Sequence, residues 1–333
     1  MISFTIIRKQ LDQMHMDIKR KILVTGGAGN IGSALTARLL KDKSTLVTVV
    51  DNLTTGSISK LDLGNEQLQF IKADANNRQE MSEIMISNRF DFVFHYAALV
   101  GVKRTQENPI KVLEDIEGIR NMLSLSKNTG VKRFFFSSSS EVYGEPVSIP
   151  QNEDTTPLNS RVPYAVVKNV GEAFCRSFHQ EYNLNYTVFR FFNTYGPNQT
   201  TDFVMSKFLA SALKNEDITI YGDGSQSRTF CYVDDNIEAT VKALNENLFV
   251  NDVVNIGGHV IVSILNLAKI IIEQTGSKSK IVFLPPLKDG DMTRRQPDNS
   301  KMRSILGREL LPIEQGIKQM IAHPDFRKQM NLQ

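Results

Sequence analysis

Residues 21–32, KILVTGGAGNIG, decide the fold that this sequence predicts. The apolar first half of this stretch predicts a buried strand, and apolar residues at helical spacing follow over 30–41. Gly26 permits a tight turn, Gly29 lets the backbone approach a pyrophosphate, and Gly32 allows the helix to pack closely on the strand. The helix N-terminus then offers amide donors and the positive end of its dipole to an anion. This strand–turn–helix unit predicts a dinucleotide site.

A carboxylate stands about 20 residues beyond the glycines, where such sites need one. Asp51 ends the second predicted strand and can accept hydrogen bonds from the adenosine ribose. The same charge would repel a ribose phosphate, so NAD is favoured over NADP. Taken alone Asp51 reads as a turn residue, but its position relative to the glycines favours the cofactor role.

The first half of the chain alternates short β-rich runs with helical patterns. Strands are predicted at 21–25, 46–51, 68–72, 90–96, 131–137 and 186–192, and helices at 30–41, 77–88, 109–129 and 162–182. Nearly continuous apolar strands joined by helices are typical of a parallel sheet covered on both faces. The predicted class is therefore α/β, with a doubly wound parallel sheet.

The second half has more glycines, prolines and turn signals. Helices are predicted at about 203–214, 233–246, 263–275 and 312–322, and short strands near 218–221, 253–256 and 280–284. We expect an N-terminal extension (1–20), a Rossmann domain (21–192) and a smaller C-terminal α/β substrate lobe (193–333), some segments of which return to the first domain. Ligands of such folds bind at the carboxyl edge of the sheet.

Composition excludes several classes of protein. The 333 residues carry 39 basic and 36 acidic side chains without a long block of like charge, which argues against nucleic-acid binding. The sequence has no apolar run of roughly 20 residues and no signal peptide, so we expect no membrane association. Cys175 and Cys231 are the only cysteines, which suits a reducing compartment such as the cytoplasm. Neither a CxxC pair nor a His/Cys cluster occurs, so no metal site is expected.

Two side chains at the start of the helix predicted at 162–182 are candidates for catalysis. Tyr164 and Lys168 are four residues apart, so they lie on one helix face about one turn apart. An ammonium group beside a phenol lowers the pKa of the phenol, and a phenolate can remove a hydroxyl proton while hydride leaves the attached carbon. The alternative is an ordinary surface pair.

A serine-rich segment, SSSSEVYG at 137–144, is expected directly after the fifth strand. Hydroxyl groups at the carboxyl end of a central strand face the ligand cleft and can bridge a substrate hydroxyl and the tyrosine. The alternative is a polar turn or a helix cap. Glu141 in this segment can act as a general acid or base, or can simply accept from a nearby amide.

Further motifs extend the pattern over about 21–323. In chain order they are TGGAGNIG (25–32), Asp51, Ala73-Asp74, HYAAL (95–99), SSSSEVYG (137–144), YAVVK (164–168), RFFNTYGP (190–197), GDGSQSRTFCYVDD (222–235) and RRQPD (294–298). This order resembles the extended short-chain dehydrogenase/reductases, the family of NAD-dependent nucleotide-sugar epimerases, dehydratases and decarboxylases, and in particular UDP-glucose 4-epimerase.

The resemblance implies a role for each matching residue. NAD would be bound by Gly26, Gly29, Asn30, Ile31, Gly32, Asp51, Asn52, Asp74, Ala75, Ala97, Ala98, Tyr164 and Lys168. Tyr164 would be the base, Lys168 its activator, and Ser139 the partner of the substrate hydroxyl. The nucleotide sugar would also contact Asn193, Arg228, Arg295 and Asp298. Guanidinium groups suit a diphosphate because they offer a planar fork of donors.

The family shares a first step, transfer of hydride from the sugar 4-position to NAD, and then diverges. In the 4,6-dehydratases the residues before VYG are Ser/Thr-Asp-Glu. Ser140 stands at the position of that Asp in this chain. In the UDP-glucuronate decarboxylases the residues before VYG are Thr-Ser-Glu, which is close to this chain. Those enzymes also carry an acidic stretch between Tyr and Lys and an arginine after FNTFGP. This chain has Ala165-Val166-Val167 and Asn198 instead.

The reaction that this pattern favours is UDP-sugar 4-epimerisation. Decarboxylation, dehydration (a 5,6-dehydratase of UDP-N-acetylglucosamine included) and net 4-dehydrogenation stay open as alternatives, because Glu141 suggests chemistry beyond epimerisation. A non-catalytic NAD- or sugar-binding protein is the contrasting class.

The stretch LVGVKRTQENP (99–109) resembles the substrate-facing segment of uronate 4-epimerases, so Lys103 and Arg104 are candidates to meet a carboxylate. The alternative is a cluster of charge at a helix entry. Asp115 stands where the family has Asn, which puts one hydrogen bond to the cofactor in doubt. By the same resemblance we expect a homodimer through a four-helix bundle of 109–129 and 162–182, and a place in the synthesis of polysaccharide precursors.

Overall fold

The structure is a computed structural model that describes residues 18–286 and 294–330. Most of the predicted extension (1–20) therefore lies outside the described residues. Within the described ranges, no helix combines the length and the hydropathy that a membrane span requires.

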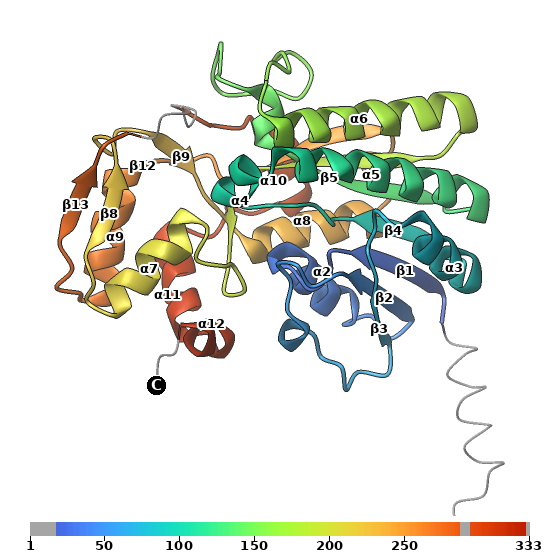
Figure 1. The fold of residues 1–333 in the computed structure, drawn as a ribbon, viewed down its shortest axis with the longest axis horizontal. Helices are drawn as coiled ribbons and strands as arrows, with labels where there is room; N and C mark the ends of the chain where they lie inside the picture. The colour runs from blue at the N-terminus through green and yellow to red at the C-terminus, as the bar shows by residue number, and fades with distance from the viewer. Residues whose placement is uncertain (1–17, 287–293, 331–333) are drawn as a thin grey trace, which may run out of the picture.

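A seven-stranded, all-parallel sheet forms the larger part of the molecule (Figure 1). Its strands lie in the order β11-β6-β5-β4-β1-β2-β3. Their bounds are β1 Arg20–Thr25, β2 Thr45–Asp51, β3 Leu68–Lys72, β4 Phe92–His95, β5 Arg133–Ser139, β6 Tyr186–Phe191 and β11 Asp252–Ile256. The edge strand β11 comes from the carboxyl half of the chain and pairs with β6. The predicted doubly wound α/β fold is confirmed.

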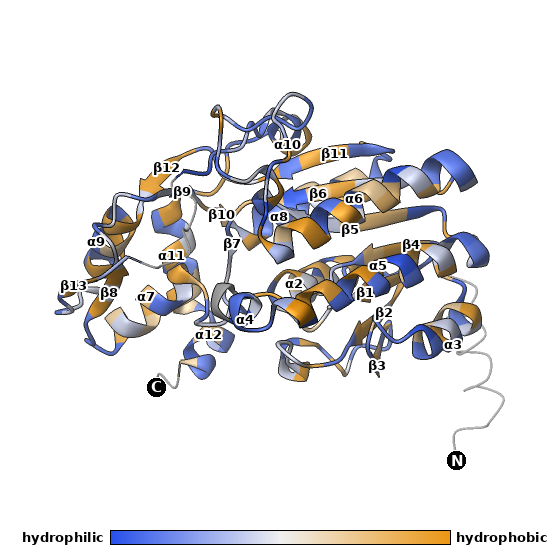
Figure 2. Ribbon diagram, turned by 45° about the horizontal axis from the view of Figure 1, so that its top comes forward, coloured by the Kyte–Doolittle hydropathy of each residue, from blue (hydrophilic) through white to orange (hydrophobic). Residues whose placement is uncertain are grey.

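Helices cover both faces of this sheet. They are α2 Asn30–Leu39, α3 Arg78–Asn88, α4 Val102–Glu107, α5 Pro109–Thr129, α6 Pro163–Tyr182, α8 Val233–Asn245 and α10 Ser300–Leu306, with short 3₁₀ turns η1 Ile58–Lys60 and η2 Ser140–Tyr143. Helices α3, α5 and α6 pack on one face, and α2 and α8 pack on the other. Figure 2 shows the apolar strands enclosed between these two layers.

Three consecutive phenylalanines in β5 show how the sequence builds the two layers. Successive side chains of a strand point to opposite faces. Phe135 accordingly packs with the α2 and α8 side, where it stacks on Phe94 of β4 with ring centroids 4.2 Å apart. Phe134 and Phe136 pack into the core beneath α3, α5 and α6. A strand that is apolar at every position is thus buried on both sides.

The boundaries of β5 differ from the prediction. The strand was expected at 131–137, but it runs from Arg133 to Ser139. Pairing with both neighbours sets these limits, since Arg133 lies opposite Phe92 of β4 and Ser139 lies opposite Phe191 of β6. Ladder hydrogen bonds use the backbone alone, so polar serines continue the strand. The expectation that the serine segment follows the strand is therefore wrong for Ser139.

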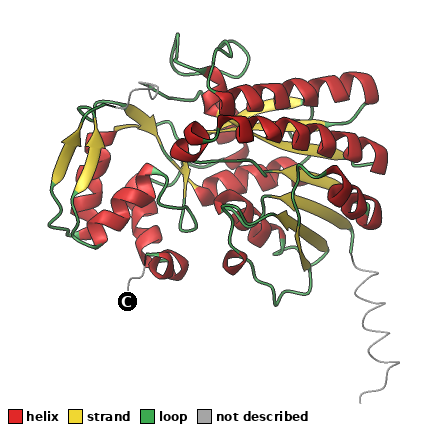
Figure 3. Ribbon diagram, in the orientation of Figure 1, coloured by secondary structure: helices red, strands yellow, loops and turns green. Residues whose placement is uncertain are grey.

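The described part of the C-terminal lobe contains three two-stranded sheets and four helices, which lie to one side of the large sheet (Figure 3). The sheets pair β7 Thr194–Tyr195 with β10 Cys231–Tyr232, β9 Ser227–Thr229 with β12 Ile261–Ser263, and β8 Ile218–Tyr221 with β13 Ile281–Leu284. The helices are α7 Val204–Leu213, α9 Ile264–Thr275, α11 Ile313–Ala322 and α12 Pro324–Gln329.

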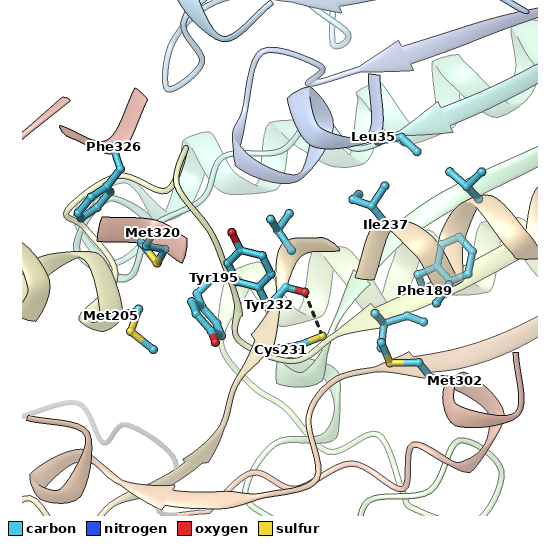
Figure 4. Packing of buried hydrophobic residues seen from close by; sticks show 14 of the residues in the cluster. Leu35, Phe189, Tyr195, Met205, Cys231, Tyr232, Ile237, Met302, Met320 and Phe326 are labelled. Carbon is cyan, nitrogen blue, oxygen red and sulfur yellow. Dashed lines mark hydrogen bonds between the residues drawn. The ribbon is translucent and has the colours of Figure 1, made fainter. Parts of the chain in front are cut away.

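One apolar core joins this lobe to the sheet. Leu35 of α2 and Phe189 of β6 belong to the same buried cluster as Met205 and Phe326 of the lobe, with Tyr195 between them (Figure 4). Because buried contacts are continuous from one part to the other, the lobe is held at a fixed place over the carboxyl edge of the sheet.

Candidate active site

A deep cleft with a cavity volume of about 470 Å³ opens at the carboxyl edge of the sheet. Its walls come from the segments that follow β1, β2, β3, β4, β5 and β6, from the start of α6, and from the lobe. Parallel strands all end at this edge, so residues far apart in sequence meet there. Of the predicted site residues, the cleft is lined by Gly26, Gly29, Asn30, Ile31, Gly32, Asp51, Asn52, Asp74, Ala75, Ala97, Ala98, Ser139, Glu141, Tyr164, Lys168, Asn193 and Arg295.

The glycine-rich turn fits a dinucleotide pyrophosphate. Gly26 has φ +70°, and a Cβ at Gly32 would lie 2.2 Å from the Gly26 carbonyl oxygen, so both positions require glycine. A Cβ at Gly29 would meet only that same carbonyl, at 3.2 Å, and otherwise enters the cleft. The buried Oδ1 of Asn30 lines the cleft and has no hydrogen-bond partner among the described residues. These features suit a ligand that accepts and donates hydrogen bonds at the start of α2.

Carboxylates line the cleft beside the glycine-rich turn. Asp51 ends β2 and accepts from the backbone N–H groups of Ala28 at 3.0 Å and Leu53 at 2.8 Å. Asn52 donates to Asp74 Oδ2 at 3.1 Å, so the loops after β2 and β3 are joined beside it. This negative rim suits ribose hydroxyls and disfavours a ribose phosphate.

The candidate catalytic tyrosine lies in the first turn of α6, where Pro163 begins the helix. Tyr164 and Ser139, at the end of β5, both line the cleft, and the Ser139 hydroxyl acts to lower the pKa of Tyr164. The Ser139 oxygen also accepts from the backbone N–H of Glu141 at 3.2 Å, which fixes its direction at the start of η2. A hydroxyl pair is therefore held at the floor of the cleft.

Lys168 lies one turn after Tyr164 and is only 3% exposed. Its Nζ donates to Ser137 Oγ at 3.4 Å and lies 5.7 Å from the centroid of the Tyr164 ring. Burial lowers the pKa of Lys168 to about 8, opposed by the negative charge of Asp115. The ammonium group is therefore held between the strand end and the tyrosine.

The expectation that Lys168 lowers the pKa of Tyr164 is wrong in this structure. Burial raises the pKa of Tyr164, and the negative charge of Glu141 raises it further, whereas the Ser139 hydrogen bond and Arg295 act in the opposite direction. Desolvation of the phenolate outweighs these two favourable interactions, since the ring is partly buried in the cleft. Spacing along a helix reveals the neighbours of a side chain but not its desolvation.

Glu141 is paired with an arginine that comes from the far end of the chain. Its Oε1 lies 3.5 Å from Arg295 Nη1, and the two side chains are 22% and 11% exposed. Both residues line the cleft, and both act on the pKa of Tyr164. An acid–guanidinium pair is thus placed beside the candidate base.

The structure places the remaining predicted substrate residues differently. Asn193 lines the cleft and donates to the Thr229 carbonyl at 2.8 Å. Arg228 is buried on β9, donates to the Ser227 carbonyl at 2.8 Å, and does not line the described part of the cleft. Asp298 also lies outside that lining and accepts from Asn152 Nδ2 at 3.1 Å. The side chain of Lys103 lies outside the described residues.

A buried ion pair connects the helix and strands that carry the candidate catalytic groups. Glu172 of α6 is fully buried and meets Arg190 of β6 through two contacts, of 2.7 and 2.9 Å. Ser138, one residue before Ser139, donates to Glu172 at 2.6 Å. Arg190 also donates to the Tyr143 hydroxyl at 2.8 Å. This network connects α6 to the ends of β5 and β6, from which the candidate catalytic groups emerge.

Several cleft residues escaped the sequence analysis. Lys60 lines the cleft and donates to the Asn198 carbonyl at 2.9 Å, although it is 138 residues away in sequence. No motif predicts such a contact. Asp115, whose hydrogen bond to the cofactor the sequence puts in doubt, lines the cleft and accepts from Leu99 N at 2.8 Å and Asn76 Nδ2 at 3.1 Å.

The match to known proteins covers most of the chain. The model of the "NAD dependent epimerase/dehydratase family" matches residues 22–257. UDP-glucuronic acid decarboxylase 1 of Danio rerio is 36% identical over 315 residues, which cover 92% of this chain and 72% of that protein. UDP-N-acetyl-alpha-D-glucosaminuronate decarboxylase of Bacillus cytotoxicus is 35% identical, over 91% of this chain and 97% of its own. The structure of UDP-glucose 4-epimerase from Thermotoga maritima superimposes with a TM-score of 0.86 and 34% identity, covering 92% of this chain and 99% of that one.

The doubly wound sheet, the glycine turn and the Tyr164–Lys168 pair together define a short-chain dehydrogenase/reductase of the extended kind. The chain belongs to the NAD-dependent epimerase/dehydratase family. Its cofactor is NAD, and the residues around Gly26–Gly32 and Asp51 fit that group.

Proposed function

We propose that this enzyme oxidises the 4-position of a UDP-linked sugar transiently. The observation that carries the proposal is that Tyr164 and Ser139 line the same cleft, with the buried Lys168 one helical turn after Tyr164. Solved relatives of similar fold include a UDP-glucose 4-epimerase with UDP-glucose, which supports this substrate class.

In this reaction Ser139 holds the sugar hydroxyl and Tyr164 removes its proton. NAD, when bound, supplies the hydride acceptor. Arg295 favours the phenolate form of Tyr164, because positive charge near a phenol lowers its pKa. The proton and the hydride both return to the sugar if the product is an epimer, so epimerisation requires no further acid or base.

We infer that the net reaction is 4-epimerisation. Ser140 is buried where the dehydratases carry an acid, so dehydration lacks its proton donor. Ala165 and Val167 pack into the interior of the molecule, where the decarboxylases have an acidic stretch. The neutral Asn198 donates to Ser33 Oγ at 3.1 Å, at the position where the decarboxylases carry an arginine.

Decarboxylation of a UDP-uronate is the second candidate, and one observation favours it. The Glu141–Arg295 pair, with 3.5 Å between its charged atoms, stands beside Tyr164 although epimerisation does not need it. A guanidinium group suits a substrate carboxylate, and the relatives from Danio rerio and Bacillus cytotoxicus are decarboxylases.

Proton NMR of the enzyme with NAD and a panel of UDP-glucose, UDP-N-acetylglucosamine, UDP-glucuronate and a GDP-sugar distinguishes the two candidates. We expect a new anomeric signal from one UDP-sugar, with unchanged mass and no net NADH. Release of carbon dioxide from UDP-glucuronate would replace the epimerase proposal with the decarboxylase. Stoichiometric NADH or loss of water would contradict both.

The proposal includes a cytoplasmic homodimer assembled through α5 and α6. The two helices pack side by side and present exposed apolar residues, including Ile110 at 72% and Leu113 at 37% exposure on α5. The buried, unpaired Cys175 and Cys231 suit a reducing compartment. Sedimentation is expected to give twice the mass of one chain, and a monomer would contradict the bundle.

A further inference from the structure

The segment 198–203 crosses from the C-terminal lobe toward the NAD domain, between β7 and α7. We call this segment the strap. Asn198, Gln199, Thr200 and Phe203 all line the cleft. The strap therefore forms part of the wall beside the glycine-rich turn, although it belongs to another part of the chain.

One end of the strap is attached beside the pyrophosphate-binding turn. Lys60 of η1 donates to the Asn198 carbonyl at 2.9 Å, and the Asn198 amide donates to Ser33 Oγ at 3.1 Å. Ser33 lies in the first turn of α2, and Lys60 lines the cleft near Asp51. These two contacts join the strap to η1 and to the first turn of α2.

The other end is attached to the segment after β4. Arg104 of α4 meets Asp202 with 3.0 Å between Nη2 and Oδ2, and the same arginine donates to the Val100 carbonyl at 2.6 Å. Thr200 Oγ1 donates to the same Asp202 oxygen at 3.2 Å. The Arg104 guanidinium group is therefore already paired with Asp202 of the strap, so it is not available to bind a substrate carboxylate.

The attachment on the lobe side is more deeply buried than the Arg104–Asp202 pair on the NAD side. Gln199 is 5% exposed, donates to the Thr194 carbonyl at 2.9 Å, and accepts from Ser206 Oγ at 3.1 Å. By contrast, the Arg104 and Asp202 side chains are 32% and 39% exposed, and such pairs contribute little. The Arg104–Asp202 contact can thus break while the strap stays fixed to the lobe.

We propose that the strap is a gate that retains NAD, with Lys60 and Arg104 as its positioning residues. The inference rests on the proposed function, because an enzyme that returns hydride to its sugar must keep the reduced cofactor until the return step. Opening requires only the contacts at Asn198 and Asp202 to break. Closed, the strap covers the part of the cleft that holds the pyrophosphate and the adjoining ribose.

The double variant Lys60→Met/Asp202→Asn tests the gate through NADH release. The protein is loaded with NADH, excess NAD is added, and the decay of bound NADH fluorescence is followed. We expect release about tenfold faster than in the unaltered protein, since two polar contacts between the strap and the NAD domain are lost. Nucleotide retained after gel filtration should fall in parallel. The single variants should give intermediate rates.

The matched control is Arg303→Met/Glu309→Gln, which removes a surface ion pair of the same 3.0 Å length away from the cleft. Its release rate should equal that of the unaltered protein. An unchanged rate in the strap variant, with its melting temperature preserved, would overturn the gate. The assay contains no sugar, so its outcome is independent of whether the enzyme proves to be an epimerase.

Discussion

Replacing Tyr164 with Phe should lower turnover by about 10²–10⁴-fold, the range for loss of a general base. The substitution removes the phenol hydroxyl, on which the Ser139 side chain acts, while the ring keeps its packing. NAD should still bind, because the glycine-rich turn and Asp51 are unaffected. Turnover is measured by NMR on the substrate identified above, and bound NAD by nucleotide analysis after gel filtration.

Tyr182→Phe is the matched control for this experiment. Tyr182 ends the same helix, is 48% exposed, and keeps its contact with Lys127 when the hydroxyl is removed. We expect it to leave turnover unchanged. Equal turnover in the Tyr164→Phe and Tyr182→Phe proteins would refute the catalytic assignment, whichever sugar is used.

The largest effect on stability is expected at Glu172. Changing it to Ala should lower the free energy of unfolding by about 3–5 kcal/mol, because a buried charge would lose its partner. Arg190 is 2% exposed and makes its two shortest ion-pair contacts with this carboxylate. Ser138 would lose its acceptor as well. Urea denaturation followed by circular dichroism measures the change.

Arg176→Ala provides the comparison, because Arg176 contacts the same carboxylate from the surface. Its Nη1 lies 3.6 Å from Glu172 Oε2, and its side chain is 48% exposed. An exposed partner contributes only about 0–1 kcal/mol. If Glu172→Ala lowers the free energy of unfolding no more than Arg176→Ala does, burial does not make this ion pair important for stability.

Much of the fold could be predicted from local pattern alone. Helix α5 was predicted with both of its ends correct, since Pro109 begins it and Gly130, with φ +79°, follows its last residue. A helix end of this kind depends on nearby residues, so the sequence carries the signal. The glycine spacing of the cofactor turn is a local signal of the same type.

The limits of β5 and the contacts of the strap were not predictable in this way. Ser139 belongs to the strand because β6 pairs with it, and no property of serine indicates that partner. Lys60 and Asn198 meet across 138 positions of sequence, and Glu141 meets Arg295 across a still longer separation. Such pairs depend on how the lobe packs over the sheet.

The sequence by itself therefore determined the family, the doubly wound sheet, the NAD turn and the identity of the candidate base. Those features depend on residue type, short spacing and the order of motifs along one chain. Only the tertiary structure decided the direction in which the pKa of that base is shifted, since burial and Glu141 raise the pKa of Tyr164 against the effect expected from Lys168. Desolvation and long-range pairing depend on which surfaces meet in the folded chain, and spacing along the sequence does not record that.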